Sequence, residues 1–377
     1  MMKNFSPLKN FSFVIFIFLM SCVQPQKTDQ KMASFYVGTY TDQNSRGIYR
    51  YELSSTGEMI NKGLVAETAN PSYLSISNNG KYLIAVNEVA DEHGMGSIES
   101  YSIQNDSLIL MSRASSGGAH PCHIRINKEN FILVSNYNGG NVALLELSEK
   151  GELIEQDIQQ HEGKGLHPRQ TAPHAHSAQF NPYNNEVIAA DLGTNELWIT
   201  PIDVINKKFI AKKTTKLIME EGAGPRHFCF HPQKNWIYVL NELNGSITQV
   251  VLSPEGEYHK LETISTLVSN FAGENLSADI HISSDGRFVY ASNRGPNQLA
   301  IFQVDEINGH LSLIAHEDTK GNWPRNFQLS PDDDFLLVAH QYSNNLSCFK
   351  RDHKTGLLTF ISEIDAPSPT CILFETK

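Results

Sequence analysis

Seven short runs of β-branched and aromatic residues recur along the chain about fifty residues apart, and this period constrains the fold more than any other feature. The runs are FYVGTY (35–40), YLIAVNE (82–88), FILVSNY (131–137), EVIAADL (186–192), WIYVLNE (236–242), FVYASNR (288–294) and FLLVAHQ (335–341). Self-similarity at that spacing is typical of propeller blades. A pair of β-sandwiches is the competing fold, but it does not account for a constant period.

Hairpin signals flank the seven runs. Six of them follow a short strand and a turn rich in Gly, Asn or Asp, such as Ser77–Gly80 and Ser283–Gly286. Most lead into a second hairpin, which makes a four-stranded blade. The first run lacks a preceding strand, and Ser368–Phe374 is a strand with nothing after it. The sequence therefore predicts an all-β, seven-bladed β-propeller over residues 35–377, closed by the C-terminal strand.

The N-terminus is typical of a targeting segment. Lys3 and Lys9 precede an apolar run, FSFVIFIFLM (11–20), which is too short to span a bilayer as a stable helix. The following Ser-Cys completes a string that resembles a bacterial lipobox, with Cys22 as the lipidated residue. We expect a lipoprotein-type signal peptide over residues 1–22 and an exported protein, lipid-anchored in the bacterial cell envelope. An ordinary cleaved signal with a chance cysteine is the alternative.

The net charge of the chain after Cys22 limits the classes of partner that it can bind. Residues 23–34 form a polar tether without apolar periodicity. After Cys22 the chain carries 28 basic residues against 41 acidic ones, a net charge of −13. Such a surface disfavours nucleic acid or anionic lipid as the main partner, so we expect membrane contact only through the anchor. The net charge does not determine the sign of charge inside a pocket.

The remaining cysteines show no metal-binding pattern. They are Cys122, Cys229, Cys348 and Cys371, and none belongs to a CxxC or CxxH string. Structural zinc is therefore not expected. Each lies in or beside an apolar strand-like run, which favours a buried small hydrophobe. A disulfide in an exported protein stays open as an alternative.

In a propeller, the loops that enter and leave the innermost strands line a central funnel, where chemistry is expected. Aligning the repeats places six residues at the start of the innermost strands: Ser72, Cys122, His176, Arg226, Ala278 and Arg325. The exits of the next strands align Glu88, Tyr137, Leu192, Glu242, Arg294 and Gln341. One blade thus offers Arg226 together with Glu242. The preceding blade offers His176, and the following one offers Arg294.

Several strings at these positions resemble one family. They are Val37-Gly-Thr-Tyr40, Pro173-His-Ala-His176, Gly224-Pro-Arg-His227, Val239-Leu-Asn-Glu242 and Ala291-Ser-Asn-Arg294. In order and spacing the chain after Met32 resembles the seven-bladed propeller lactonases, which include the propeller-type bacterial 6-phosphogluconolactonases and the fungal carboxymuconate cyclases. The resemblance implies a hydrolase that opens a sugar-acid lactone without a metal or other cofactor. It also implies that His176, Arg226, Glu242 and Arg294 cluster in the central cleft.

The chemistry of these groups agrees with such a site. Two guanidiniums beside one carboxylate leave a net positive pocket that suits a small anionic lactone. We expect Glu242 to act as general base on water, with Arg226 and His176 stabilising the oxyanion or protonating the leaving ring oxygen. Arg294 would hold the anionic group of the substrate. The further substrate-binding candidates are His174 and Arg325.

Each assignment has a structural alternative. Glu242 and Arg226 could form an ion pair that only braces neighbouring loops, and His176 could be a packing histidine. Other histidines in the same loops, His120, His123, His174 and His227, more often cap strands than act. Glu88 ranks below Glu242 because its matched inner position is Ser72, not an arginine. The His-rich stretch 161–176 has no HExxH or equivalent metal spacing.

Two questions about function stay open from the sequence. A non-catalytic propeller that binds a protein or glycan at the cell envelope is the alternative to the lactonase, since fold alone does not decide activity. A periplasmic redox propeller is disfavoured by the absence of CxxCH from the sequence. A lipid-anchored exported protein would not meet a cytosolic phosphorylated lactone. Either the substrate is another anionic lactone, or the predicted anchor is wrong.

Overall fold

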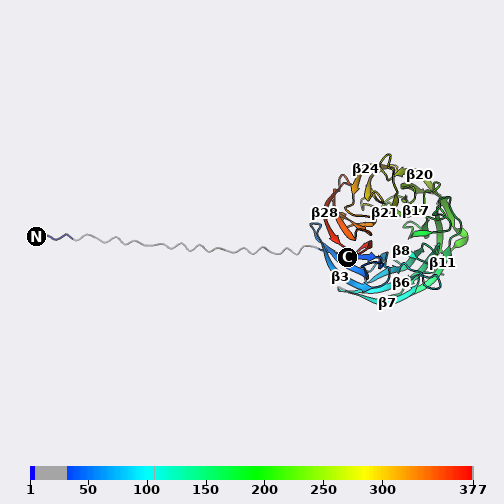
Figure 1. The fold of residues 1–377 in the computed structure, drawn as a ribbon, viewed down its shortest axis with the longest axis horizontal. Coiled ribbons are helices and arrows are strands. Elements are labelled where there is room, and N and C mark those ends of the chain that lie inside the picture. Colours follow the sequence, from blue (N-terminus) through cyan, green and yellow to red (C-terminus); the bar gives the residue numbers. More distant parts are fainter. Residues whose placement is uncertain (5–31, 106, 376–377) are drawn as a thin grey trace. The chain divides into compact units, whose positions relative to one another are not determined.

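The computed structural model describes residues 1–4, 32–105 and 107–375, and residues 33–374 form a seven-bladed β-propeller (Figure 1). The predicted fold class is therefore confirmed. The predicted signal peptide with Cys22, and most of the tether, lie outside the described residues. Within the described part of the chain, no helix has the length and apolar character needed to cross a membrane.

The seven sheets are the blades, and they succeed one another around the ring in chain order. Within each blade, the strands are ordered from the axis outward. Blade 1 consists of β29 (Pro369–Phe374), β1 (Ala33–Thr39), β2 (Gly47–Leu53) and β3 (Met59–Glu67). Blade 2 consists of β4 (Leu74–Ile76), β5 (Tyr82–Asn87), β6 (Ser97–Gln104) and β7 (Ser107–Ser115). Blade 3 consists of β8 (Pro121–Ile126), β9 (Phe131–Asn136), β10 (Asn141–Leu147) and β11 (Leu153–Gln160).

Blade 4 is the irregular one. It contains β12 (Ala175–Phe180), β13 (Glu186–Asp191) and β14 (Glu196–Asp203), and its outer edge is split into β15 (Lys208–Phe209) and β16 (Thr215–Ile218) by the short 3-10 helix Ala211–Lys213. Blade 5 consists of β17 (Pro225–Phe230), β18 (Trp236–Asn241), β19 (Ser246–Leu252) and β20 (Tyr258–Ser265). Blade 6 consists of β21 (Leu276–Ile282), β22 (Phe288–Arg294), β23 (Gln298–Val304) and β24 (Leu311–Asp318). Blade 7 consists of β25 (Pro324–Leu329), β26 (Phe335–His340), β27 (Asn345–Arg351) and β28 (Leu358–Asp365).

The seven runs singled out by the period form the second strand of each blade. These strands are buried almost throughout, and every residue of β9, β18 and β26 is buried. A strand with neighbouring blades packed on both faces requires apolar residues on both faces, so it reads as a continuous hydrophobic run. The outermost strands instead expose many side chains, as in β3 and β7. The repeat thus reflects the core between adjacent blades.

The ring closes where the two ends of the fold meet. β1 pairs antiparallel with β29, with Phe35 opposite Phe374 and Tyr36 opposite Leu373. Figure 1 shows this junction as the blue and red strands lying side by side. The predicted closure by the C-terminal strand is confirmed. β29 thus covers the edge of β1 that would otherwise lie unpaired in blade 1.

A β-bulge near the start of the innermost strand recurs in several blades. The pairing register shifts between Ala175 and Ser177 in blade 4 and between Pro225 and His227 in blade 5. Equivalent shifts flank Cys122 in blade 3 and Arg325 in blade 7. A bulge re-aims the extra side chain, and bulges are common beside active sites. In these four blades the residue aligned from the sequence, Cys122, His176, Arg226 or Arg325, is therefore the bulged one.

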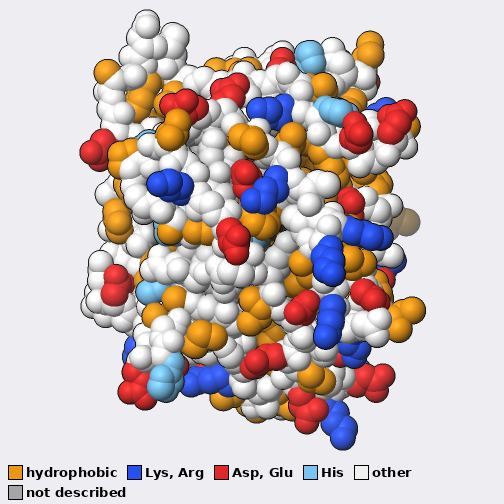
Figure 2. All heavy atoms as spheres, turned by 90° about the vertical axis from the view of Figure 1, so that its right-hand side faces the viewer, with side chains coloured by type: hydrophobic (Ala, Val, Ile, Leu, Met, Phe, Trp, Pro, Cys, Tyr) orange, Lys and Arg blue, Asp and Glu red, His pale blue; other side chains and the backbone are white. Residues whose placement is uncertain are grey.

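One side of the outer rim of the ring carries mixed charges. Figure 2 views the side that lies at the right of Figure 1, where acidic and basic side chains are interspersed with small apolar areas.

The four described cysteines are free, and three of them, Cys122, Cys348 and Cys371, are buried. This agrees with their interpretation as small hydrophobic residues.

Candidate functional site

A buried carboxylate, Glu242, lies at the centre of the candidate site. It follows β18 and is 2% exposed. Its Oε2 atom is 2.9 Å from Arg226 Nε and 2.9 Å from Arg294 Nη2. Arg226 occupies the bulge of blade 5, and Arg294 ends β22 of blade 6, where its Nε donates to the carbonyl of Leu276 at 2.9 Å. The structure therefore brings together the glutamate and both arginines predicted from the sequence.

A third arginine, Arg169, was missed by the sequence analysis. Its Nη1 lies 2.6 Å from Glu242 Oε1, and its side chain is 41% exposed. It comes from the connection between β11 and β12, residues 161–174. This connection belongs to the His-rich stretch 161–176, which has no metal-binding spacing. The loop is held by Gln170, a fully buried residue whose Nε2 donates to the carbonyl of Leu192 at 2.8 Å. The unusual length of this connection was the one signal in the sequence.

The three arginines determine the protonation state of the carboxylate. Burial acts to raise the pKa of Glu242, but its arginine partners outweigh burial and lower the pKa to about 2. Removing one partner of such a buried group is costly, since it leaves uncompensated charge. Three guanidiniums against one carboxylate also leave two positive charges in excess. The centre therefore suits an anionic ligand.

His176 occupies the bulge of blade 4 beside this cluster. Its Nε2 is 4.0 Å from Glu242 Oε2, and its Nδ1 is 3.7 Å from Cys122 Sγ. Burial, together with the nearby Arg226 charge, holds the pKa of His176 well below its usual range. The imidazole is therefore neutral at physiological pH, with one nitrogen able to donate and the other able to accept a proton.

His174 lies further out, against Tyr137. Their rings are stacked with centroids 4.4 Å apart, and His174 Nδ1 is 3.0 Å from the carbonyl oxygen of Tyr137. The hydroxyl of Tyr137 accepts a hydrogen bond from Arg169 Nη2 at 3.1 Å. His174 thus reaches the central cluster through Tyr137 and Arg169 rather than by direct contact with Glu242.

Arg325 belongs to a second polar cluster, which is formed by blades 7, 1 and 2. Its Nη2 donates to the hydroxyl of Tyr40 at 2.6 Å, and that hydroxyl donates to Glu88 Oε2 at 2.8 Å. The hydroxyl of Ser72 also donates to Glu88. A small cavity of about 10 Å³, roughly the room of one water molecule, lies between this cluster and Arg226. Arg325 therefore approaches the arginine group without contacting Glu242.

A histidine and an aspartate support Arg226 from behind. His227 Nδ1 is 2.7 Å from Asp279 Oδ1, and His227 Nε2 is 3.2 Å from Arg226 Nη1. Because a carboxylate only accepts, it fixes the proton on Nδ1 and leaves the lone pair of Nε2 for the guanidinium. Burial and Arg226 lower the pKa of His227 to about 4, so the ring is neutral. The interpretation of His227 as a strand cap missed this contact.

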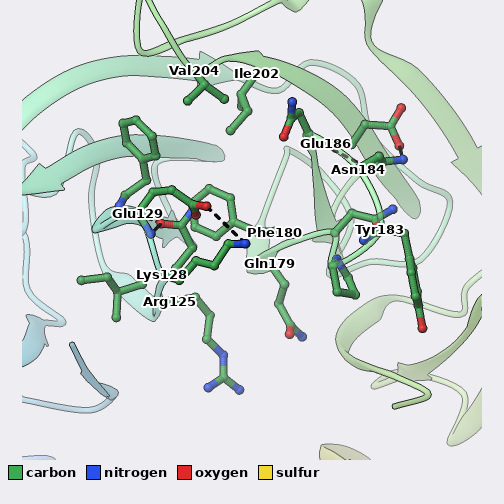
Figure 3. Close-up of a pocket in the computed structure, with 16 residues that line it drawn as sticks. Arg125, Lys128, Glu129, Gln179, Phe180, Tyr183, Asn184, Glu186, Ile202 and Val204 are labelled. Atoms are coloured by element: carbon green, nitrogen blue, oxygen red, sulfur yellow. Dashed lines mark hydrogen bonds and ion pairs between the residues drawn. The ribbon is translucent and has the colours of Figure 1, made fainter. Parts of the chain in front are cut away.

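A larger hollow, of about 720 Å³, lies elsewhere, between the turns that join the inner strands of blades 3 and 4 (Figure 3). It is lined by apolar residues such as Phe131, Phe180 and Val204, with exposed polar groups at its rim. These turns lie at the opposite ends of the strands from the bulges. The hollow contains no buried cluster of charges among the residues that line it, so its size does not make it the candidate site.

The chain is similar to known proteins over almost the whole propeller. Residues 34–374 match the family model described as lactonase, 7-bladed beta-propeller. The chain is 35% identical over 346 residues to a 6-phosphogluconolactonase of Bacillus subtilis, covering 90% of this chain and 97% of the relative. It is 36% identical over 333 residues to a 6-phosphogluconolactonase of Formosa agariphila, covering 86% and 94%.

A solved structure gives the same result for the fold. The periplasmic gluconolactonase of Pseudomonas aeruginosa superposes with a TM-score of 0.87 at 29% identity, covering 92% of this chain and 99% of that one. The family model spans nearly the whole propeller, including all the residues of the central cluster. This chain belongs to the lactonase family of seven-bladed β-propellers.

Proposed function

We propose that the protein is a hydrolase that opens a sugar-acid lactone in the central funnel. The observation that carries this proposal is the buried Glu242 held by three arginines with a neutral His176 beside it. A purely structural ion pair needs one arginine, whereas a cationic excess suits a substrate that brings its own negative charge. The named 6-phosphogluconolactonase relatives support the same reaction class.

The two oxygens of Glu242 have different partners, and this difference suggests a mechanism. Oε2 is held by two buried arginines, whereas Oε1 is held by Arg169, which is partly exposed. When Arg169 turns to the anionic group of the substrate, Oε1 becomes available to a water molecule. Loss of that guanidinium also raises the pKa of the carboxylate, which makes Glu242 a better general base.

The remaining groups have roles in the rest of the reaction. The activated water adds to the carbonyl carbon, and its proton passes to Glu242. Arg226 stabilises the oxyanion that forms, and Arg294 helps to hold the anionic group of the substrate. As the tetrahedral intermediate collapses, the bond to the ring oxygen breaks, and His176 donates a proton to this oxygen while it takes up the proton that Glu242, 4.0 Å away, received from the water. Glu242 and His176 thus return to their starting protonation states. The product is the open-chain hydroxy acid.

His174 and Arg325 have outer roles in this proposal. His174, stacked on Tyr137, would position Arg169 and contact the far end of the substrate. Arg325, paired with Tyr40 and Glu88, would bind substrate oxygens on the other side of the funnel. Each is therefore a substrate-binding residue rather than a catalytic one.

The substrate and the location of the protein are linked. Two relatives are named for the phosphorylated lactone, whereas the Pseudomonas protein is named a periplasmic gluconolactonase. With the lipobox-like string at Cys22, we propose an exported, lipid-anchored enzyme that acts on an unphosphorylated sugar-acid lactone whose negative charge is a carboxylate. Membrane partitioning of the full chain and of its Cys22→Ser variant tests the anchor. Equal partitioning of both would remove the reason to exclude the phosphorylated substrate.

A lactone-opening assay tests the activity. The purified protein is given glucono-1,5-lactone, its 6-phosphate and a lactone that carries a carboxylate, glucaro-1,4-lactone, and acid release is followed after subtraction of spontaneous hydrolysis. Glu242→Gln should lower kcat by about 10²-fold or more, the usual contribution of a general base. The matched control is Glu255→Gln, an exposed glutamate after β19 in the same blade. Equal rates for the wild type, Glu242→Gln and Arg226→Lys would leave the non-catalytic binding propeller as the better interpretation.

A further inference from the structure

A separate cavity of about 220 Å³ lies along the propeller axis, beyond His227 as seen from Glu242. It is lined by residues of four inner strands, β8, β12, β17 and β21, and by Tyr73 just before β4. Walls from five successive blades place it in the central channel. We call it the axial cavity. Its volume is many times the roughly 10–15 Å³ that a cavity needs to hold one water molecule.

Three polar side chains in the wall of the axial cavity lack a hydrogen-bond partner among the described residues: Tyr73, His123 and Arg125. Tyr73 and His123 are 7% and 1% exposed, and their rings pack with centroids 4.6 Å apart. His123 Nδ1 and Arg125 Nε are both shielded from solvent and unbonded. Buried polar groups are normally satisfied, so two shielded and unbonded nitrogens in the wall of one cavity, with the unbonded Tyr73 hydroxyl in the same wall, point to a missing occupant.

All three groups have protons to donate. The guanidinium carries five N–H donors and no acceptor. Burial raises the pKa of the Tyr73 hydroxyl, which therefore keeps its proton. Burial and the Arg125 charge hold the pKa of His123 well below its usual range, which leaves a neutral ring with one N–H. The complementary occupant is an acceptor, and a guanidinium fits a planar or tetrahedral oxyanion best.

The carboxylate in the same wall, Asp279, does not supply that acceptor. Its Oδ1 accepts from His227 Nδ1 at 2.7 Å, and its Oδ2 accepts from His281 Nε2 at 3.0 Å and from Asn326 Nδ2 at 2.6 Å. The backbone N–H of Ile280 adds a further bond to Oδ1 at 3.0 Å. Asp279 is thus saturated by other donors, while Arg125 has no partner among the described residues.

We propose that the axial cavity is a second ligand site that binds a small oxyanion, a carboxylate or a phosphate, on Arg125, with Tyr73 and His123 completing its hydrogen bonds. Arg125 and Gln179 line both this cavity and the hollow of Figure 3. In Figure 3 the Arg125 guanidinium points away from the other labelled side chains, and Arg125 also lines the axial cavity. The ligand would approach from the face opposite the Glu242 cluster.

Thermal unfolding in the presence of anions tests this site. The full chain is heated with increasing sodium phosphate and, separately, sodium acetate, at an ionic strength held constant with sodium chloride. A ligand that binds only the folded state raises Tm with the logarithm of its concentration. Arg125→Gln should weaken the apparent affinity by about tenfold or more, because it removes a charge-assisted hydrogen bond. Tyr73→Phe, which keeps the ring and loses the donor, should weaken it less.

The control variant separates the two anion-binding regions. Arg294→Gln removes a guanidinium from the Glu242 cluster and leaves the axial cavity unchanged, so the anion-dependent rise in Tm should persist. Comparison of the phosphate and acetate series identifies the oxyanion that the site accepts. The proposal fails if neither anion raises Tm. It also fails if Arg294→Gln abolishes the effect while Arg125→Gln and Tyr73→Phe both keep it in full.

Discussion

Arg169 Nη1 lies 2.6 Å from Glu242 Oε1, although the two residues are 73 positions apart in the sequence. Arg169 follows β11, whereas Glu242 follows β18. This contact joins an exposed loop to the buried centre of the funnel. Since the remaining partners of Glu242 are buried, Arg169 is the arginine that can exchange its carboxylate for a ligand without moving a strand. The loop over residues 161–174 is therefore a part of the site.

We predict that Arg169→Ala acts mainly on substrate binding. Loss of a charge-assisted hydrogen bond to the anionic substrate should raise KM by about 10- to 100-fold, with a much smaller change in kcat. Steady-state kinetics with the preferred lactone measure both constants. Lys164→Ala, which removes an exposed cation from the same loop, is the control and should leave KM within about twofold. A loss confined to kcat would show that Arg169 serves the chemistry instead.

The contrast between Arg169 and Arg226 shows what the sequence predicts and what it does not. Arg226, Glu242 and Arg294 lie at positions that repeat from blade to blade. Aligning the repeats therefore predicts that all three face the same central funnel. Arg169 lies in a connection with no counterpart in the other blades, and its path over the funnel depends on contacts such as Gln170 with Leu192. Periodicity carries no information about such a segment.

Asp279 escaped the alignment for a related reason. The matched position in blade 6 is Ala278, and the register of β21 shifts over Ser277 to Ile280, so the next residue also faces the channel. Its contact with His227 follows from packing between blades 5 and 6, which no single repeat encodes. Burial of the second strands, by contrast, follows from their composition alone.

The pH dependence of the reaction should be nearly flat near neutrality. The pKa of Glu242 is lowered to about 2, so the carboxylate is ionised in the free enzyme above about pH 4. The pKa of His176 is held well below its usual range, so the imidazole is already neutral there. The profile of kcat/KM should therefore show no acidic limb between about pH 5.5 and 7.5, a window of about two units around the ordinary histidine value.

Initial rates in non-chelating buffers, corrected at each pH for uncatalysed lactone opening, give this profile. A limb with a midpoint near the ordinary histidine value of about 6.5 would mean that a histidine other than His176 is essential. In that case His174, which is less buried than His176, becomes the first residue to substitute.

We predict that His227 positions Arg226 rather than binding substrate. In His227→Gln the acceptor for Arg226 Nη1 is displaced, so the guanidinium loses its alignment with Glu242, and kcat should fall by about tenfold or more while KM changes little. His281→Gln is the matched control, because His281 also contacts Asp279 but has no contact with Arg226. It should keep kcat within about threefold. Equal losses in both variants would indicate general damage to the channel.

Closure of the ring by β29 should determine whether the propeller folds at all. A chain that ends at Ser368 lacks the innermost strand of blade 1 and leaves the edge of β1 unpaired. It also loses the buried side chains of Cys371, Ile372 and Phe374, and burying each large apolar side chain contributes about 1.5–3 kcal/mol. That sum is comparable with the total stability of about 5–15 kcal/mol of a typical protein.

We therefore expect the truncated chain to lose cooperative thermal unfolding, measured by circular dichroism. A chain that begins at Met32 retains every strand and should unfold like the full protein. If the truncated chain unfolds cooperatively near the Tm of the full protein, β29 is dispensable, and six complete blades with an open first sheet are sufficient for the fold.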